Sequence, residues 1–232
     1  MVQEPDMAAV AALIGEPTRA IILSALLGGE ALPASELAFR AQVTPQTASS
    51  HLSKLLEGNL LKVATVGRHR YYSLKNHAVA QTLESLQVIA PLSQPGPLHM
   101  PKISPELCHA RTCYDHLAGR LGVTLTEVWL QQTYLIQKNQ NYEIAPKGIE
   151  WLESWKIDVE LLKKKRRKLA YACLDWSERR FHIAGSLGAA LADLFFENGW
   201  IKRLPQSRAL KITAVGENLL KQEFGIALPE AQ

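Results

Sequence analysis

The stretch from Thr44 to Leu56, TPQTASSHLSKLL, constrains the fold of this chain more tightly than any other. The hydroxyl of Thr44 can accept a hydrogen bond from an otherwise unpaired N–H in the first turn of a helix. Pro45 suits the first helical position, where its missing N–H costs nothing. Apolar residues then recur at helical spacing on one face: Ala48, Leu52, Leu55 and Leu56. The sequence therefore predicts an amphipathic helix over 44–56.

The opposite face of this helix carries polar side chains, namely Gln46, Thr47, Ser50, Ser53 and Lys54. Hydroxyls, an amide and one cation can hydrogen-bond DNA base edges and phosphates without blocking close approach. An ordinary surface helix would show the same pattern, so this helix alone leaves both interpretations open. The neighbouring segments decide between them.

The flanking segments complete a small domain. Apolar spacing and capping signals predict helices over 6–14, 17–27, 35–41 and 76–90. A tight turn at Gln42 to Thr44 joins the third of these to the helix over 44–56, which is the helix-turn-helix arrangement. Two β-rich runs, 60–66 and 69–74, then predict a hairpin around Gly67-Arg68. The tip of this hairpin carries Arg68, His69 and Arg70, within reach of phosphates or the minor groove.

The charge distribution supports a nucleic-acid partner. The whole chain has a formal net charge of only +4. Residues 1–39 hold one basic residue, Arg19, against Glu4, Asp6, Glu16, Glu30 and Glu36. Residues 40–75 reverse this balance, with Glu57 against Arg40, Lys54, Lys62, Arg68, Arg70 and Lys75. The basic excess thus lies on the predicted reading helix and hairpin, where phosphates would be contacted.

Three segments together resemble the ArsR/SmtB family of winged-helix repressors over roughly residues 8–90. They are GEPTRAIILSALLGG, SELAFRAQVTPQTASSHLSKLLEGNLL and VGRHRYYSL. The resemblance implies a winged helix-turn-helix that represses transcription by binding operator DNA. It also implies a homodimer that pairs through its first and last helices, here 6–14 and 76–90. The predicted DNA-binding residues are Thr44, Gln46, Thr47, Ser50, His51, Lys54, Arg68, His69 and Arg70.

The two common metal sites of that family are not expected here. The helix over 35–41 contains no Cys-x-Cys pair, and the helix over 76–90 has His77 and Glu84 without the Asp-x-His pairing. His51 has no nearby ligand partner in the sequence, so a groove-facing or helix-packing role is favoured over metal binding.

A proline-rich segment separates this domain, residues 1–90, from the rest of the chain. Residues 91–105, PLSQPGPLHMPKISP, predict an extended linker because proline lacks an N–H donor and disfavours helix in the residue before it. Residues 106–232 then form a second domain with its own organisation.

The second domain contains an internal repeat. The segment from His116 to Gly122, HLAGRLG, recurs 66 residues later as HIAGSLG from His182 to Gly188. After a two-residue slip, 142–148 aligns with 210–216. The pattern predicts an α+β domain of two helix–hairpin–helix repeats, about 113–157 and 179–225, in a chain that is mainly α with small β-hairpins. Glycines inside the predicted helices (Gly119, Gly122, Gly185 and Gly188) indicate close helix–helix approach or approach of a ligand.

Each repeat opens with a Cys-x-Asp motif followed by a histidine. The candidate effector residues are Cys113, Asp115, His116, Cys173, Asp175, Trp176 and His182. If the two sets meet at a pseudo-twofold axis, they could bind a soft metal or present thiols that a helix N-terminus activates. Two alternatives stay open: a purely structural role, or an organic effector pocket lined by Tyr114, Trp176 and the glycines. No cofactor is predicted, and the pattern does not establish a metal site.

Other functions are weaker interpretations. An enzyme fused to a winged helix could use Cys113 as nucleophile and His116 as base, three residues apart on one helix face. The chain lacks a nucleophile elbow, a phosphate loop and an HExxH motif, so a non-enzymatic regulator is preferred. A protein-interaction module without DNA reading is opposed by the basic bias of 40–75. The charge run at 163–168 could extend the DNA footprint or form a solvated face.

The sequence predicts a cytoplasmic protein with no membrane partner. Its three cysteines make no disulfide framework, and it contains neither a signal-peptide pattern nor a long apolar stretch.

Overall fold

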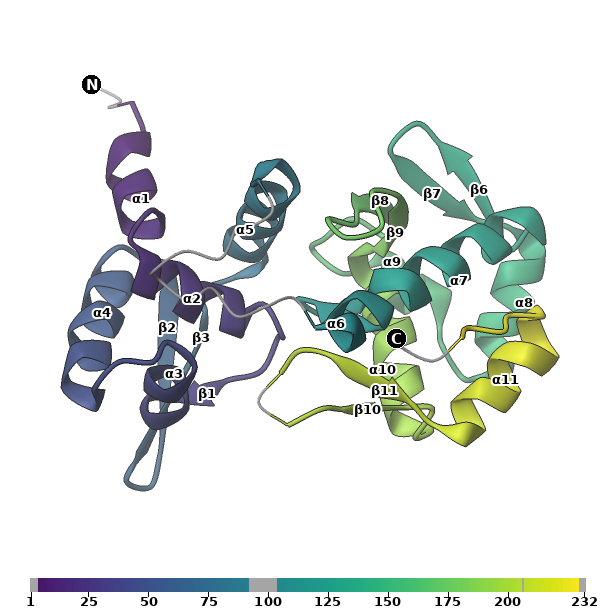
Figure 1. The fold of residues 1–232 in the computed structure, drawn as a ribbon. Helices are drawn as coiled ribbons and strands as arrows, with labels where there is room; N and C mark the ends of the chain where they lie inside the picture. Colours follow the sequence, from purple (N-terminus) through teal and green to yellow (C-terminus); the bar gives the residue numbers. More distant parts are fainter. Residues whose placement is uncertain (1–3, 92–103, 206, 230–232) are drawn as a thin grey trace. The chain divides into compact units, whose positions relative to one another are not determined.

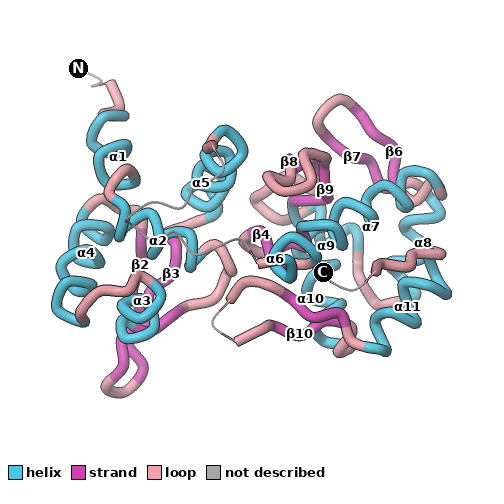
Figure 2. Tube along the Cα trace, in the orientation of Figure 1, coloured by secondary structure: helices cyan, strands magenta, loops and turns pink. Residues whose placement is uncertain are grey.

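The computed structural model describes residues 4–91, 104–205 and 207–229. These residues fall into two compact units, one before and one after the proline-rich segment. Figure 2 shows that each unit combines helices with short strands. Most of the predicted linker lies outside the described residues, but Ser104 and Pro105 do not: they cap and begin a short helix. The prediction of an extended linker was therefore wrong at its end.

The first unit is a winged helix-turn-helix (Figure 1). Its elements are α1 (Met7–Ile14), α2 (Pro17–Leu26), β1 (Leu32–Pro33), α3 (Ala34–Arg40), α4 (Pro45–Glu57), β2 (Leu61–Val66), β3 (His69–Leu74) and α5 (His77–Ile89). The three strands form an antiparallel sheet in the order β1-β3-β2. Every helix and the hairpin lie where the sequence predicts them. The two-residue strand β1 was not predicted, because it exists only through its pairing with β3.

Capping side chains set where these helices begin. Asp6 accepts from the N–H of Ala9, Thr44 from that of Thr47, and Asn76 from that of Val79. The apolar face of α4 packs inward through Ala48, Leu52 and Leu55. Its burial fixes α4 against α2 and α3, so its polar face must point outward.

The second unit contains two successive runs of similar elements (Figure 1). The short helix α6 (Pro105–His109) comes first. The first run is β4 (Arg111–Cys113), β5 (His116–Ala118), α7 (Gly119–Gln131), β6 (Leu135–Lys138), β7 (Asn141–Ile144) and α8 (Pro146–Ser154). After α9 (Val159–Lys163), the second run is β8 (Tyr171–Leu174), β9 (Phe181–Ala184), α10 (Gly185–Glu197), β10 (Ile201–Arg203), β11 (Leu210–Ile212) and α11 (Ala214–Phe224). Each run is thus hairpin, helix, hairpin, helix.

The later hairpin of each run bonds to the opening hairpin of the other run. In one direction, the N–H of Tyr142 donates to Ala170 and that of Ala172 to Gln140. In the other, the N–H of Leu210 donates to Ala110 and that of Thr112 to Arg208. These reciprocal bonds make the four-stranded sheet β6-β7-β8-β9 and join β11 to β4. The exchange brings the two opening hairpins together.

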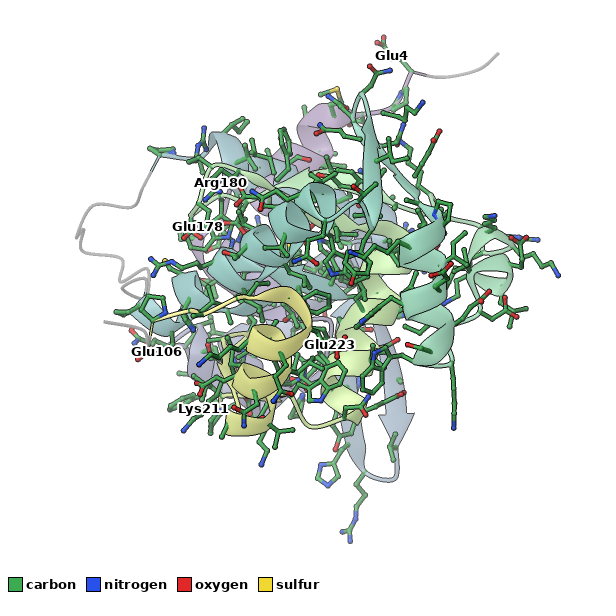
Figure 3. All side chains as sticks on the ribbon, turned by 90° about the vertical axis from the view of Figure 1, so that its right-hand side faces the viewer. Glu4, Glu106, Glu178, Arg180, Lys211 and Glu223 are labelled. Atoms are coloured by element: carbon green, nitrogen blue, oxygen red, sulfur yellow. The ribbon has the colours of Figure 1, made fainter. Side chains whose placement is uncertain are left out.

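Aromatic rings fill the core of the second unit. Trp129 is fully buried and stacks on Tyr134, with the Trp151 ring edge-on to it. Phe224 lies against all three rings. The Trp151 indole N–H donates to Glu223, which lies on α11 and is labelled in Figure 3. This core holds both runs as one body.

Within the described ranges, no single helix is both long enough and apolar enough to cross a membrane. Only α1 and α2 taken together pass it on length and composition, and the chain bends by 87° between them.

Candidate functional site

The polar face of α4 is open to solvent. Thr44, Gln46, Thr47, Ser50 and Lys54 are all exposed. The hydroxyls of Thr44 and Thr47 lie 2.9 Å apart, so the capping residue also orients the next hydroxyl on this face. This face therefore presents donors and acceptors of the kind that read base edges.

The β2–β3 hairpin forms a basic wing. Its strands pair in register up to Val66 and His69, which leaves Gly67-Arg68 as the two-residue turn. Gly67 has φ of +60°, a conformation that glycine adopts without strain. Arg68, His69 and Arg70 are exposed. The wing projects away from the helices of its unit at the bottom of Figure 1.

His51 packs between helices. Its Nδ1 lies 3.2 Å from a carboxylate oxygen of Glu16, and the side chain is 17% exposed. Glu16 itself caps α2 by accepting from the N–H groups of Thr18 and Arg19. This placement favours the helix-packing alternative for His51 over a groove-facing role.

Four potential metal ligands converge in the second unit, and we call them the Cys–His cluster: Cys113, His116, Cys173 and His182. One ligand atom from each lies within 4.8 Å of all the others. Cys113 is the cross-strand partner of His116 in β4–β5, and Cys173 is that of His182 in β8–β9. The two histidines meet with their Nε2 atoms 3.1 Å apart. The two opening hairpins thus contribute one thiol and one imidazole each.

A carboxylate faces the outer nitrogen of each cluster histidine. Asp115 lies 3.4 Å from His116 Nδ1, and Asp175 lies 3.5 Å from His182 Nδ1. Each carboxylate in turn pairs with an arginine. Arg167 contacts Asp115, and Arg111 donates to both oxygens of Asp175 at 2.8 Å.

Burial and charge determine the ionisation of these groups. Burial would raise the pKa of Asp175, but Arg111 and His182 hold that pKa well below its usual range. Hydrogen bonds from His116 and Arg167 lower the pKa of Asp115 in the same way, against the effect of burial. Burial and the neighbouring His116 lower the pKa of His182 well below its ordinary value, despite the opposing carboxylate of Asp175. The cluster therefore combines ionised carboxylates with a neutral His182 ring.

Two glycines let each helix approach the other run's histidine. A Cβ at Gly188 would lie 2.6 Å from the Ile183 carbonyl oxygen and 3.0 Å from the Cβ of His116. A Cβ at Gly122 would lie 2.4 Å from the Leu117 carbonyl oxygen. The close approach is thus to the preceding strand and to a histidine. Helix–helix contact is not found at Gly122 and Gly188, whereas a Cβ at Gly119 would lie 2.6 Å from the Cys108 carbonyl oxygen in α6.

Gly122 and Gly188 border only a small void. The void bordered by Gly122 and Gly188 measures about 10 Å³, which is too small for an organic effector. A larger hollow of about 610 Å³ lies elsewhere, between α8 and α10 beside Trp155 and Asp193.

The comparisons with known proteins identify the first unit and the whole chain. A family model described as a helix-turn-helix domain matches residues 14–64. The chain is 41% identical over 224 residues to a Bacillus subtilis (strain 168) protein named "Uncharacterized HTH-type transcriptional regulator YdfF". That match covers 97% of this chain and 99% of the relative. The chain belongs to the HTH-type transcriptional regulators.

Solved structures similar to this HTH-type regulator cover only part of it. NolR from Sinorhizobium fredii is 25% identical, with a TM-score of 0.34, and its whole length covers 40% of this chain. The cadmium sensor CMTR from Mycobacterium tuberculosis is 31% identical, with a TM-score of 0.32, and its whole length covers 41% of this chain. The helix-turn-helix predicted within residues 8–90 is confirmed, and the chain is a DNA-binding transcriptional regulator.

The structure corrects the local placement of the cluster residues in this HTH-type regulator. Cys113 and His116 lie on two paired strands, so the predicted pairing on one helix face was wrong. Cys113 and Cys173 lie in strands, so no helix N-terminus activates either thiol. Strands also occupy 116–118 and 181–184, and the helices begin after them at Gly119 and Gly185. Trp176 stays outside the cluster and stacks on Arg111 at 4.3 Å.

Two functional-site residues were not predicted from the sequence. Arg111 is fully buried beside Asp175, and Arg167 is the inward-facing member of the charge run at 163–168. The rest of that run is exposed. The repeated pattern did not mark Arg111, because Tyr171 stands at the equivalent position two residues before Cys173.

Proposed function

We propose that this regulator is a homodimeric repressor that binds a palindromic operator. The observation that carries the proposal is the exposed polar face of α4 beside a basic wing in one rigid winged helix. The proposed contacts to bases and phosphates come from Thr44, Gln46, Thr47, Ser50, Lys54, Arg68, His69 and Arg70, with His51 supporting α4 from behind. Such a helix enters the major groove while the wing reaches adjacent phosphates.

The apolar surfaces of α1 and α5 support dimerisation. The helix α1 has the sequence MAAVAALI and buries none of its residues. Met7 on α1 is 81% exposed, and Ile89 on α5 is 78% exposed. Apolar helices in this state gain free energy when a second copy covers them. On α5, Leu83 is buried within the chain, whereas Leu86 and Ile89 are exposed.

The second unit is proposed as the regulatory half, built from two copies of one ancestral unit. The equivalent order of elements and the reciprocal bonds between hairpins support the duplication. We place the DNA-binding domain at 1–90 and the regulatory domain at 105–232, beginning with α6, with the linker between them. Regulation is favoured over catalysis because Cys113 is 4% exposed, which keeps a substrate from its thiol. The cytoplasm is the proposed compartment, where these thiols stay reduced.

Selection from a pool of random-sequence duplexes with the full chain tests this function. The expected product is a palindrome, as two-fold symmetry requires, with half-sites centred about 10 base pairs, or one turn of DNA, apart. Placed behind a promoter, this sequence should lower reporter transcription when the protein is present. Failure to enrich any sequence would overturn the DNA-reading proposal, and raised transcription would overturn repression.

A further inference from the structure

The Cys–His cluster has the composition and spacing of a tetrahedral metal centre. Two thiols and two imidazoles are the ligand set that Zn²⁺ and similar ions prefer in closed four-ligand sites. Metal–ligand distances in such sites place neighbouring ligand atoms about 3.3–3.8 Å apart. Here the four ligand atoms already lie within 4.8 Å of one another, and the two Nε2 atoms lie 3.1 Å apart. Small side-chain adjustments would complete a tetrahedron.

The outer carboxylates orient both imidazoles for metal binding. Asp115 and Asp175 each face the Nδ1 atom of a cluster histidine, so a proton on Nδ1 is stabilised there. Both Nε2 atoms then direct lone pairs toward the same point. At 3.1 Å the two Nε2 atoms are at hydrogen-bond distance, and an ion that binds both takes the place of the proton between them. Carboxylate–histidine–metal arrangements have this geometry in known metal sites.

The charges of the cluster balance with a divalent ion. The two carboxylates are already matched by Arg111 and Arg167. Two thiolates would leave the cluster with a charge of −2, which a divalent cation neutralises. Because three of the four ligands are buried, this neutrality matters for stability.

The surroundings hold the ligands in place and leave an entrance. Asp175 also accepts from the N–H of Gly119 and from Ser177, which fixes its position behind His182. Arg180 pairs with Glu127, and Glu178 lies 3.9 Å from Arg120, so the loop between β8 and β9 is tied to α7. Figure 3 labels Glu178 and Arg180 on this loop. Cys173 is the partly exposed ligand and marks the side from which an ion can enter.

We propose that Cys113, His116, Cys173 and His182 bind one divalent ion of the zinc class per chain and thereby cross-link the two opening hairpins. All four positions of the tetrahedron are protein ligands, so the centre is a structural or sensory site with no open position for substrate. The inference does not depend on DNA binding, and it assigns a ligand to the proposed regulatory half.

Titration of the reduced, metal-depleted full chain with Co²⁺ tests the centre directly. Tetrahedral Co²⁺ gives intense visible absorption, and thiolate ligands add charge-transfer bands in the near ultraviolet. We expect saturation at one ion per chain and displacement of Co²⁺ by Zn²⁺. Cys113→Ser and Cys173→Ser should each weaken the charge-transfer bands and the affinity. Cys108→Ser is the matched control, because the third cysteine lies outside the cluster, and it should behave as wild type.

Asp115→Asn keeps all four ligands and therefore guards against variants that fail to fold. It should weaken Co²⁺ binding about 10- to 100-fold with an unchanged circular dichroism spectrum. The proposal is overturned if the reduced wild type takes up no ion, or if Cys113→Ser, Cys173→Ser and Asp115→Asn all bind Co²⁺ as wild type does. Because the titration contains no DNA, its result is separate from that of the duplex selection.

Discussion

Arg111 illustrates how one residue can tie the second unit together. Its guanidinium is fully buried, donates to both oxygens of Asp175 and to Ser177, and stacks on Trp176. A buried ion pair adds little net stability compared with an apolar pair, but removal of one partner leaves a buried charge uncompensated. Arg111 therefore matters through the carboxylate that it neutralises.

Substitution Arg111→Met should lower the free energy of unfolding of the second unit by about 3–5 kcal/mol. The physical reason is the buried carboxylate of Asp175, which loses its cation. Urea denaturation followed by tryptophan fluorescence measures the change, since the aromatic core lies in this unit. Arg166→Met, at an exposed position of the charge run, is the control and should change stability little. Equal stability of the two variants would contradict this role for Arg111.

At the scale of helices and strands, the sequence predicted the first unit well and the second incompletely. The capping residues Asp6, Thr44 and Asn76 predicted where helices begin, and Gly67 predicted the turn of the wing. These predictions succeeded because capping and turn formation depend on neighbouring residues in the sequence. The hairpins β4–β5 and β8–β9 were missed because their strands have only three or four residues. Residues 116–118 were assigned to a helix, since the apolar pattern of HLAGRLG is compatible with one.

The convergence of the two motifs lay beyond what the sequence could decide. The repeated Cys-x-Asp and histidine raised the hypothesis that the two sets meet, but their meeting depends on the exchanged hydrogen bonds between hairpins. Those bonds join Tyr142 to Ala170 and Leu210 to Ala110. The bonded residues are far apart in the sequence, so a pattern of neighbouring residues does not predict the pairing. The same holds for Arg111 and Asp175, which are 64 residues apart.

Helices α1 and α5 provide a prediction at this scale. Ile89→Glu should shift the chain from dimer to monomer in sedimentation experiments, because the charge would be buried in the proposed interface. The matched control is Val215→Glu on α11, where a similarly exposed apolar residue lies outside that surface. A wild-type chain that sediments as a monomer, or an Ile89→Glu variant that remains dimeric, would contradict the proposed seam.

In the molecule as a whole, the proposed DNA binding and the proposed metal binding belong to two different compact units. The groups proposed to contact DNA all come from α4 and the wing of the first unit, whereas the Cys–His cluster belongs wholly to the second. Amino-acid substitutions can therefore separate the tasks in the full chain. The central claim concerns the first of them: that the polar face of α4 reads sequence while the wing holds phosphate.

The most direct test is a fluorescence anisotropy titration of the selected duplex and a scrambled duplex, over a series of salt concentrations. Arg68→Ala should weaken binding to both duplexes and reduce the slope of log affinity against log salt by about 1. Gln46→Ala should reduce the binding free energy for the selected duplex by about 1–3 kcal/mol and leave binding to the scrambled duplex unchanged. Lys211→Ala, an exposed lysine of β11, serves as the control and should match wild type on both. Wild-type binding by the Arg68 and Gln46 variants would contradict the account.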